Sequence, residues 1–432
     1  MSTFESVLHS LNKQSQIITD ADRVTAEQLL AEALALRTAF AKLKAKSVAV
    51  IYTDSISFVT ALIAFDGFCE KIYLCSKDSG KDTPQDVYRW SVKSTSDFTE
   101  VTQGGELSQP LQTKWYLASS GTSGKPKWFS HSFTNLISQI RVSDTLKNLC
   151  WANLYEPHRF AGLQVLLQAL LSGASLVVTA QTSLIDKVKI FAQQGVSAIS
   201  ATPSMWRQLL MTNQLQSLSL SNITLGGEIA DQGILDSLSY IFPKANIRHI
   251  YASTEAGIGF VVSDKGAGFP KSWLQEGVNN AELTVDDNQH LRIKPKGELD
   301  KSLDSLIDNN GFLDTQDRVD LINDRVLFLG RASGIINVGG NKVHPEKVES
   351  VLLSVNGVQQ SRVYAKANSV LGALVEADIV IGKSFDRSSV LKNIREECKL
   401  QLQRFEIPVK LTQVANIRVN SSGKLSRSNV ND

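Results

Sequence analysis

The stretch Ser-Ser-Gly-Thr-Ser-Gly-Lys-Pro-Lys occupies residues 119–127 and follows an apolar run at 115–117. It concentrates hydroxyls, glycines and two lysines, so its backbone N–H groups and side chains can surround a chain of phosphates. A Walker A loop needs Ser or Thr after the Gly-Lys pair, but Pro126 stands there. Because proline has a fixed φ and no N–H, it does not open the helix of a P-loop. The stretch therefore predicts a nucleotide triphosphate site that differs from that of P-loop ATPases.

Apolar strands and amphipathic helices alternate on both sides of this stretch. We expect strands at the continuous apolar runs 47–52, 71–75, 174–180, 196–200, 223–225 and 247–251. A capping box, Thr25-Ala-Glu-Gln28, predicts a long helix that ends at about Lys44. Continuous apolar strands separated by helices indicate a sheet covered on both faces. Because ligands bind at the carboxyl ends of strands in open α/β sheets, we expect the loops after residues 117, 200, 225 and 251 to meet around one site.

The pattern changes after Gly259, where two antiparallel hairpins are predicted at 283–294 and 321–329. The remaining chain has its own signals, including a helix at 346–353 and a strand at 409–414. We predict an α/β fold with two domains. A large N-terminal domain of layered α/β sheets would cover residues 1–330, and a smaller, mobile α+β domain would cover 331–432.

Composition excludes several classes of function. The 432 residues include 45 Lys and Arg against 43 Asp and Glu, and this balance gives no electrostatic footprint for nucleic acid. The most apolar segment, 160–178, contains several polar residues and predicts a buried helix and strand rather than a membrane span. The four cysteines form no C-x-x-C pair, so neither a zinc site nor a disulfide scaffold is predicted. No signal peptide is evident, and we expect a cytoplasmic protein.

Further motifs follow the phosphate loop in a fixed order. They are Gly226-Gly-Glu228, Tyr251-Ala-Ser-Thr-Glu255, Thr315-Gln-Asp317 with Gly330-Arg331, and Gly423-Lys-Leu-Ser-Arg427. With them, the chain resembles the superfamily of adenylate-forming enzymes: acyl- and aryl-CoA synthetases, carrier-protein adenylation domains and luciferases. The resemblance runs from about residue 45 to the end. The sequence departs from the family's usual pattern at Trp128, Ala252 and Gln316.

The resemblance implies an enzyme that activates a carboxylic acid with ATP and Mg²⁺, releases pyrophosphate and transfers the acyl group to a thiol. The family's nucleotide-binding positions correspond here to Ser119, Ser120, Gly121, Thr122, Ser123, Gly124, Lys127, Gly226, Gly227, Glu228, Tyr251, Ala252, Asp317 and Arg331. By the same resemblance, Tyr251 would stack on adenine, and Asp317 and Arg331 would hold the ribose. The catalytic residues would be Lys424, Thr254 and Glu255, with Glu255 as the Mg²⁺ ligand.

The family's smaller domain rotates between the two half-reactions. The resemblance places the hinge at Ser333, where Asp or Lys is usual, and a glycine loop at Gly339 and Gly340 that would line the tunnel for the thiol. The thiol would belong to CoA or to the phosphopantetheine of an acyl carrier protein, and the sequence leaves both open. Because only 118 residues precede Ser119, we expect a shortened N-terminal region, which is common among members that act beside carrier proteins.

The segment 155–163 resembles the family's acyl pocket, and it points to His158, Arg159 and Gly162 as pocket residues. Amino-acid-activating members use an aspartate there to pair the substrate's ammonium group, and Glu156 is the only acid between 153 and 165. We therefore expect an aryl or fatty acid substrate. Two alternatives stay open: an amino-acid-activating, carrier-loading domain, and a homologue that binds nucleotide or acyl-adenylate without turnover.

Overall fold

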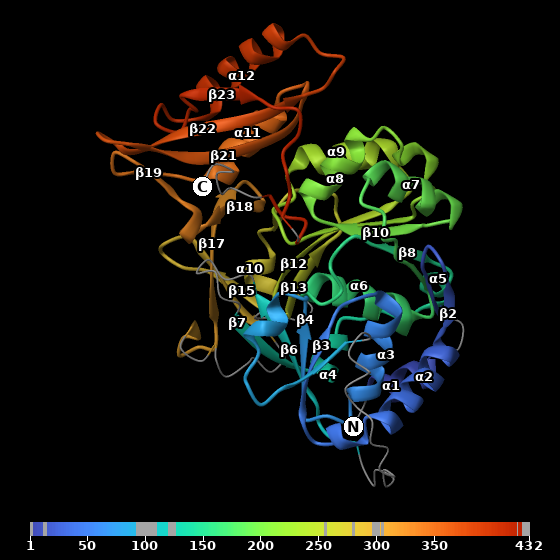
Figure 1. The fold of residues 1–432 in the computed structure, drawn as a ribbon. Coiled ribbons are helices and arrows are strands. Elements are labelled where there is room, and N and C mark those ends of the chain that lie inside the picture. The colour runs from blue at the N-terminus through green and yellow to red at the C-terminus, as the bar shows by residue number, and fades with distance from the viewer. Residues whose placement is uncertain are drawn as a thin grey trace.

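The computed structural model describes residues 3–11, 15–91, 110–119, 127–254, 257–278, 281–295, 303, 306–420 and 422–425. The strands of these residues form four sheets, and helices cover or separate them (Figure 1). The described helices are α1 Phe4–Leu11, α2 Ala26–Ala39, α3 Ser55–Phe65, α4 Phe133–Ile137, α5 Asp144–Lys147, α6 Phe160–Ser172, α7 Leu184–Gln193, α8 Pro203–Met211, α9 Gln232–Ile241, α10 Trp273–Glu276, α11 Pro345–Ser354 and α12 Arg387–Gln401.

The largest sheet has eight strands, most of them parallel. Its order is β13 (Gly257–Val262), β12 (Asn246–Ser253), β11 (Asn222–Gly226), β10 (Ala198–Ala201), β8 (Cys150–Asn153), β9 (Ser175–Val177), β1 (Gln16–Ile18) and β2 (Arg23–Thr25). The predicted strands at 174–180, 196–200, 223–225 and 247–251 all lie in this sheet. The carboxyl ends of its parallel strands therefore share one edge, which is where a ligand site is expected.

A second sheet carries the strands that flank the phosphate loop. Its order is β5 (Tyr88–Trp90), β3 (Ser47–Ile51), β4 (Lys71–Cys75), β6 (Lys114–Ser119) and β7 (Lys127–Ser132). The strands β6 and β7 are antiparallel, with Ser119 opposite Lys127, so the first and last residues of the loop lie side by side. The prediction of layered α/β sheets is confirmed, because the strands predicted at 47–52 and 71–75 lie in this sheet and those predicted after the loop lie in the eight-stranded sheet.

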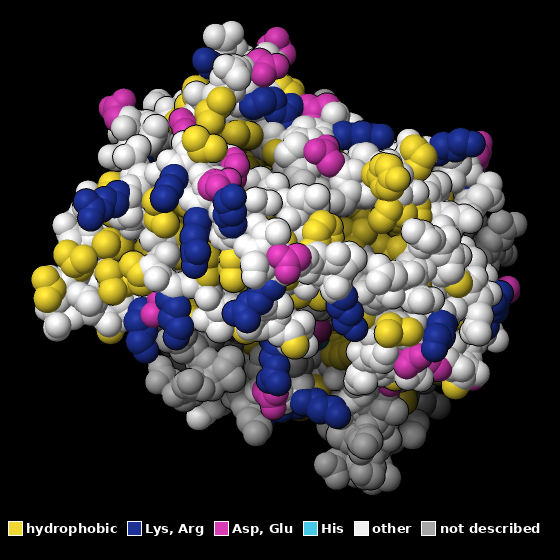
Figure 2. Space-filling view, turned by 90° about the horizontal axis from the view of Figure 1, so that it is seen from above, with side chains coloured by type: hydrophobic (Ala, Val, Ile, Leu, Met, Phe, Trp, Pro, Cys, Tyr) yellow, Lys and Arg dark blue, Asp and Glu magenta, His cyan; other side chains and the backbone are white. Residues whose placement is uncertain are grey.

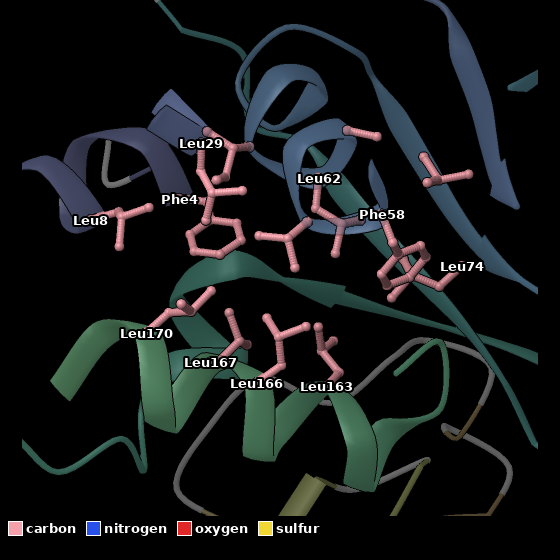
Figure 3. Close-up of a cluster of buried hydrophobic side chains, with 14 of the residues drawn as sticks. Phe4, Leu8, Leu29, Phe58, Leu62, Leu74, Leu163, Leu166, Leu167 and Leu170 are labelled. Atoms are coloured by element: carbon pink, nitrogen blue, oxygen red, sulfur yellow. The ribbon is translucent and has the colours of Figure 1, made fainter. Parts of the chain in front are cut away.

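Helix α6 lies between these two sheets and is apolar around most of its circumference, as a fully buried helix must be. Leu163, Leu166, Leu167 and Leu170 of α6 face side chains of α1, α2 and α3, among them Phe4 and Leu62 (Figure 3). Burial of each such leucine contributes roughly 1.5–3 kcal/mol. Gly173 adopts a left-handed conformation (φ 82°) that ends the helix and lets the chain turn into β9.

The hairpins predicted after Gly259 form a third sheet. Its order is β14 (Phe269–Pro270), β18 (Arg325–Arg331), β17 (Leu313–Ile322), β16 (His290–Pro295) and β15 (Ala281–Val285). The turn predicted at Asn323-Asp324 joins β17 to β18, and Asn323 has the positive φ (53°) that such a turn requires.

The fourth sheet contains only strands that follow residue 335. Its order is β20 (Asn341–Val343), β19 (Ile336–Val338), β22 (Gly372–Ile381) and β21 (Val358–Asn368). The fifth strand, β23 (Lys410–Gln413), also pairs with β22 and runs parallel to it. Helices α11 and α12 pack on it around a separate apolar core. From this lobe, drawn orange to red in Figure 1, the chain descends toward α8.

Local signals in the sequence explain where helices begin and end. Thr25 and Gln28 form the predicted capping box at the start of α2. That helix ends at Ala39, earlier than predicted, and a short 3-10 turn (Ala41–Leu43) follows it. Pro203 occupies the first turn of α8, with Thr202 as its N-cap. No helix among the described residues is both long enough and apolar enough to cross a membrane.

Candidate active site

A single cavity of about 1600 Å³ runs between the sheets and the C-terminal lobe. Its walls include the ends of β6 and β7, the loops after β10 and β11, the end of β12, and residues of β17 and β18. As expected, the described loops after residues 200, 225 and 251 meet around this cavity. The C-terminal lobe contributes residues of α11 and the segment that carries Lys424.

Lys424 lies across the backbone of Gly227. A Cβ atom added at Gly227 would stand 3.3 Å from Lys424 Cε, and Gly227 already has a positive φ of 83°. A side chain at this position would therefore strain the backbone and press on the lysine. The Lys424 ammonium group also favours the ionised form of Asp317. Lys424 and Asp317, which are distant in sequence, thus share one end of the cavity.

Two hydrogen bonds fix the segment around Lys424 to the large sheet. The hydroxyl of Thr202, fully buried at the end of β10, donates to the carbonyl of Gly423. The backbone N–H of Leu425 donates to Glu228 Oε1 (2.5 Å), while Glu228 Oε2 accepts from the N–H of Ser204 (2.9 Å). Residues on both sides of Lys424 are therefore anchored, and Thr202 and Glu228 act as positioning residues.

Asp317 and Arg331, the residues predicted to hold the ribose, lie on neighbouring strands. Asp317 of β17 is opposite Arg331 of β18, and Arg331 Nε lies 3.3 Å from Asp317 Oδ1. The hydroxyl of Tyr251 donates to Asp317 Oδ2. Burial raises the pKa of Asp317, while the charge of Arg331 and the Tyr251 hydroxyl bond oppose that rise. The carboxylate therefore depends on these partners to remain ionised.

Tyr251 is held on three sides. Its ring stacks on Phe260 and Phe328, each at a centroid distance of 5.1 Å, and its hydroxyl binds Asp317. Burial and the neighbouring Asp317 carboxylate raise its pKa well above the usual value. The predicted stacking of Tyr251 on adenine stays a prediction, because the ring contacts in the structure are with these two phenylalanines.

Much of the predicted phosphate loop lies outside the described residues. This applies to Ser120, Gly121, Thr122, Ser123, Gly124 and Glu255. Ser119, Lys127 and Thr254 are described, and all three line the cavity. The backbone carbonyl of Thr254 is 2.8 Å from Nε2 of the buried His131.

Among the described residues, Asp286, His290 and Asp314 could together hold a metal ion, but the Arg292 guanidinium group already forms an ion pair with Asp286 (3.0 Å).

The predicted pocket residues separate into two groups. Arg159 lines the cavity and pairs with Glu156, with Nε 2.6 Å from Oε2. His158 is not among the described lining residues; it is buried against Tyr52, and burial lowers its pKa to about 4. Gly162 allows α6 to approach the preceding loop, because an added Cβ would stand 2.2 Å from the carbonyl oxygen of Glu156.

The remaining predicted residues also differ in position. Gly226, Gly227, Glu228 and Ala252 line the cavity. Gly339 and Gly340 form the turn between β19 and β20 and are not among the described lining residues. Their role in a thiol tunnel stays a prediction.

Sequence reasoning missed Thr202, His131 and Arg248. Thr202 could have been found, because a threonine before a proline at a strand end is a typical helix cap that faces the ligand edge. His131 and Arg248 lie inside strands, where nothing in the local pattern distinguishes them.

Comparison with known proteins agrees with this architecture. The fold has a larger lobe and a C-terminal lobe, and both contribute to the walls of the cavity. The model of the AMP-binding enzyme family matches residues 34–299, and the chain belongs to that family.

Two relatives and one solved structure illustrate the likeness. The 2-succinylbenzoate–CoA ligase of Bacillus subtilis (strain 168) is 25% identical over 342 residues, which cover 74% of this chain and 69% of the relative. The 3,4-dihydroxybenzoate–[aryl-carrier protein] ligase of Bacillus anthracis is 23% identical over 397 residues, covering 88% and 89%. The structure of o-succinylbenzoate CoA synthetase from Bacillus subtilis with its acyl-adenylate intermediate gives a TM-score of 0.73 at 20% identity, covering 100% and 99%.

These findings confirm the predicted superfamily and the α/β fold class. They also confirm the predicted enzyme class, an AMP-forming acid–thiol ligase, since the relatives are named as a CoA ligase and an aryl-carrier protein ligase.

Proposed function

We propose that this protein joins a carboxylic acid to ATP at the Lys424 end of the cavity and then passes the acyl group to a pantetheine thiol. In the first step a carboxylate oxygen attacks the α-phosphorus, the bond to the β-phosphate breaks, and pyrophosphate leaves. In the second step the thiolate attacks the acyl carbonyl and AMP leaves. The observation that supports this most directly is the anchoring of Lys424 over Gly227, in the cavity that Asp317 and Arg331 also line.

Lys424 has the charge that the first step requires. Negative charge must be brought together when a carboxylate approaches a triphosphate, and a fixed cation at that point lowers the barrier. We assign Lys424 to the substrate carboxylate and the α-phosphate, with Thr254 as a donor to the same phosphate. Asp317 and Arg331 would hold the ribose, and Lys127 with the preceding loop would hold the outgoing pyrophosphate.

Mg²⁺ would neutralise phosphate charge when bound, because it is a hard cation that prefers carboxylate and phosphate oxygens. A carboxylate next to Thr254, as Glu255 is in the sequence, suits that chemistry. We therefore keep Glu255 as the proposed metal ligand.

The pocket favours an aryl or fatty acid over an α-amino acid. Glu156, the only acid between residues 153 and 165, is already paired with Arg159. Asp231, a further acid in the cavity wall, is paired with Arg207, with Oδ2 and Nη2 2.5 Å apart. An incoming ammonium group would have to displace one of these pairs, which costs more than binding a neutral group there.

The acceptor, the domain movement and the cellular location complete the proposal. Acyl carrier protein and CoA are both candidates for the acceptor. The chain would hinge near Ser333, between a domain of residues 1–330 and one of 331–432, and the separate apolar core of the fourth sheet supports this boundary. A cytoplasmic location is consistent with the four free cysteines.

Pyrophosphate exchange into ATP with a panel of aryl, fatty and amino acids tests the proposal. We expect exchange with an aryl or fatty acid, followed by thioester formation with CoA or with holo carrier protein, detected by mass spectrometry. Exchange with amino acids alone would favour the carrier-loading alternative. Binding of ATP without exchange for any acid would favour the homologue that lacks turnover.

A further inference from the structure

The end of the cavity away from Lys424 carries two arginines. Arg248 of β12 and Arg141, which follows α4, both line the main cavity, and both also line a smaller hollow that adjoins it. Arg248 is half-buried, whereas Arg141 is exposed. The arginines therefore stand where the acid pocket meets the outer hollow.

Arg248 has one hydrogen-bond partner among the described residues. Its Nε donates to Thr224 Oγ1 (3.1 Å) on the neighbouring strand β11, which fixes the plane of the guanidinium group. The described part of the chain supplies no acceptor to its two Nη groups and no carboxylate that pairs with it. A guanidinium group presents five N–H donors, so four remain for a ligand.

Arg141 adds a second positive charge and is held in place through its backbone. The side-chain amide of Gln168 on α6 accepts from the N–H of Arg141 (3.2 Å) and donates to its carbonyl (2.8 Å). Burial, followed by the charge of Arg141, lowers the pKa of Arg248. Two like charges at the end of a pocket oppose one another unless an anion lies between them.

The acidic side chains of the outer hollow do not neutralise these two arginines. Glu276 and Glu282 line the outer hollow, but the described residues include no ion pair between either of them and these arginines. Glu282 instead approaches Lys294, with a distance of 4.0 Å between Oε1 and Nζ. By contrast Arg207, another arginine of the cavity wall, is paired with Asp231. Among the described residues, Arg248 therefore lacks the carboxylate partner that Arg207 has in the same cavity.

The strand register gives the length of the site. Thr224 lies opposite Arg248 in the sheet, and Gly227, beneath Lys424, lies three residues further along the chain. At ~3.3 Å per strand residue the two ends are roughly 10 Å apart. This span suits a small acid, such as an aromatic ring with a short side chain or a chain of about nine carbons.

We infer that Arg248, assisted by Arg141, selects acids that carry a second anionic group, most favourably a carboxylate, about 10 Å from the carboxylate that is activated. This inference rests on the proposed function and narrows its substrate. An unsubstituted fatty acid would place its methyl end against two guanidinium groups and remove their hydration without replacing it, which is costly. A second carboxylate would instead accept two N–H bonds from Arg248.

Two matched pairs of acids test the inference: 4-carboxycinnamate against 4-methylcinnamate, and nonanedioate against nonanoate. In pyrophosphate exchange, we expect kcat/KM to favour the carboxyl-ended member of at least one pair by about 10-fold to 100-fold, the range for a bond to a charged group. Arg248→Met should abolish or reverse this preference and leave the KM for ATP unchanged. A wild-type preference for the methyl-ended member of both pairs would overturn the inference.

Arg207→Lys is the matched control, because it changes another arginine of the cavity wall but keeps the positive charge that pairs with Asp231; it should retain the wild-type preference. Equal slowing of all four acids in Arg248→Met would assign Arg248 a structural role and reject the inference. If Arg248→Met does not fold, as judged by circular dichroism, the exposed Arg141→Met variant should lower the preference by about threefold, and an unchanged preference there counts against the inference.

Failure of the proposed function is distinguishable from failure of this inference. If no acid supports exchange, calorimetric binding of each pair to the wild-type protein, with a non-hydrolysable ATP analogue present, still decides the question. Tighter binding of the carboxyl-ended acids supports the role of Arg248, whereas equal or weaker binding contradicts it.

Discussion

The two ends of the cavity are built by opposite means. At the Lys424 end, the charged residues come from segments far apart in sequence and are joined to one another, as Asp317 is to Arg331 and Glu228 to the backbone of Leu425. At the other end, Arg248 lies on β12 of the eight-stranded sheet. Its Nη groups have no acceptor among the described residues. The first arrangement places a cation for chemistry, and the second leaves a cation available for a ligand.

The comparison teaches where each kind of mutation should act. Contacts that hold the Lys424 segment connect two lobes, so changes there should alter the rate of one half-reaction. Contacts that hold Arg248 lie within one sheet, so changes there should alter which acid binds. On the upper face, Lys and Arg side chains are scattered among acidic and apolar ones (Figure 2).

Replacement of Lys424 by alanine is expected to have the largest effect. Removal of a fixed donor from developing negative charge costs about 10²-fold to 10³-fold in rate. We expect that loss in pyrophosphate exchange, with little change in the thermal unfolding temperature, because Lys424 is exposed. The variant should still form thioester from supplied acyl-adenylate. Lys383→Ala, at an exposed site of the same lobe, is the control, and wild-type exchange by Lys424→Ala would refute the assigned role.

Replacement of Glu228 by alanine is expected to follow. The change leaves the N–H groups of Leu425 and Ser204 without their shared acceptor. Bonds of this kind to a charged group are worth about 1.5–3 kcal/mol, so the kcat of adenylation should fall about 10-fold to 100-fold.

If Glu228 positions Lys424, its replacement should slow adenylation but not thioester formation. Thioester formation from supplied acyl-adenylate should stay near the wild-type rate, and Glu228→Gln should restore part of the lost adenylation. Equal loss of both half-reactions would show that Glu228 supports the fold in general rather than the placement of Lys424. Thr202→Val should act in the same direction, because it removes the bond to Gly423.

Tyr251→Phe is expected to have a smaller effect, confined to ATP. The ring contacts with Phe260 and Phe328 can persist, and only the hydroxyl bond to Asp317 is lost. Loss of one such bond predicts an increase of about 3-fold to 10-fold in the KM for ATP. The KM for the acid should not change.

The pH dependence of this variant sharpens the test. Burial raises the pKa of Asp317, and the Tyr251 hydroxyl opposes that rise. Without the hydroxyl the pKa rises further, so the carboxylate that should accept from the ribose becomes protonated at a higher pH as the pH falls. The increase in the KM for ATP should therefore begin at a higher pH in Tyr251→Phe than in wild type. Identical pH profiles would argue against Asp317 as the ribose acceptor.

Sequence reasoning succeeded where a residue type and its local pattern carry the information. Strand ends, the Thr25 capping box and the turn at Asn323 could be read because each depends on neighbouring residues alone. Asp317, Arg331 and Lys424 were named through motifs, and the structure brings them into one cavity. Layered sheets were predicted, but not which strand belongs to which sheet, because strand pairing is decided by long-range packing around α6 rather than by local pattern.

The residues at the Arg248 end of the cavity were also not predicted from local sequence pattern. Sequence pointed to His158 and Arg159, yet His158 is buried against Tyr52 and Arg159 is paired with Glu156. Arg248 was overlooked because an arginine in a strand usually points to solvent. Only the pairing of β11 with β12, and the approach of the 139–141 segment to α6, reveal that it faces the cavity.

Thr224→Val should have the smallest effect and should act at the Arg248 end alone. Valine has nearly the shape of threonine, so the packing of β11 is kept, but Arg248 Nε loses its acceptor. This bond positions the guanidinium group and does not contact the substrate, so we expect a change of only about 2-fold to 5-fold in kcat/KM for carboxyl-ended acids, or about 1 kcal/mol. Methyl-ended acids and ATP should be handled as in wild type, and steady-state kinetics with the matched pairs measures the difference. An effect larger than that of Arg248→Met, or one shared by all acids, would mean that Thr224 acts on the sheet itself rather than through the guanidinium group.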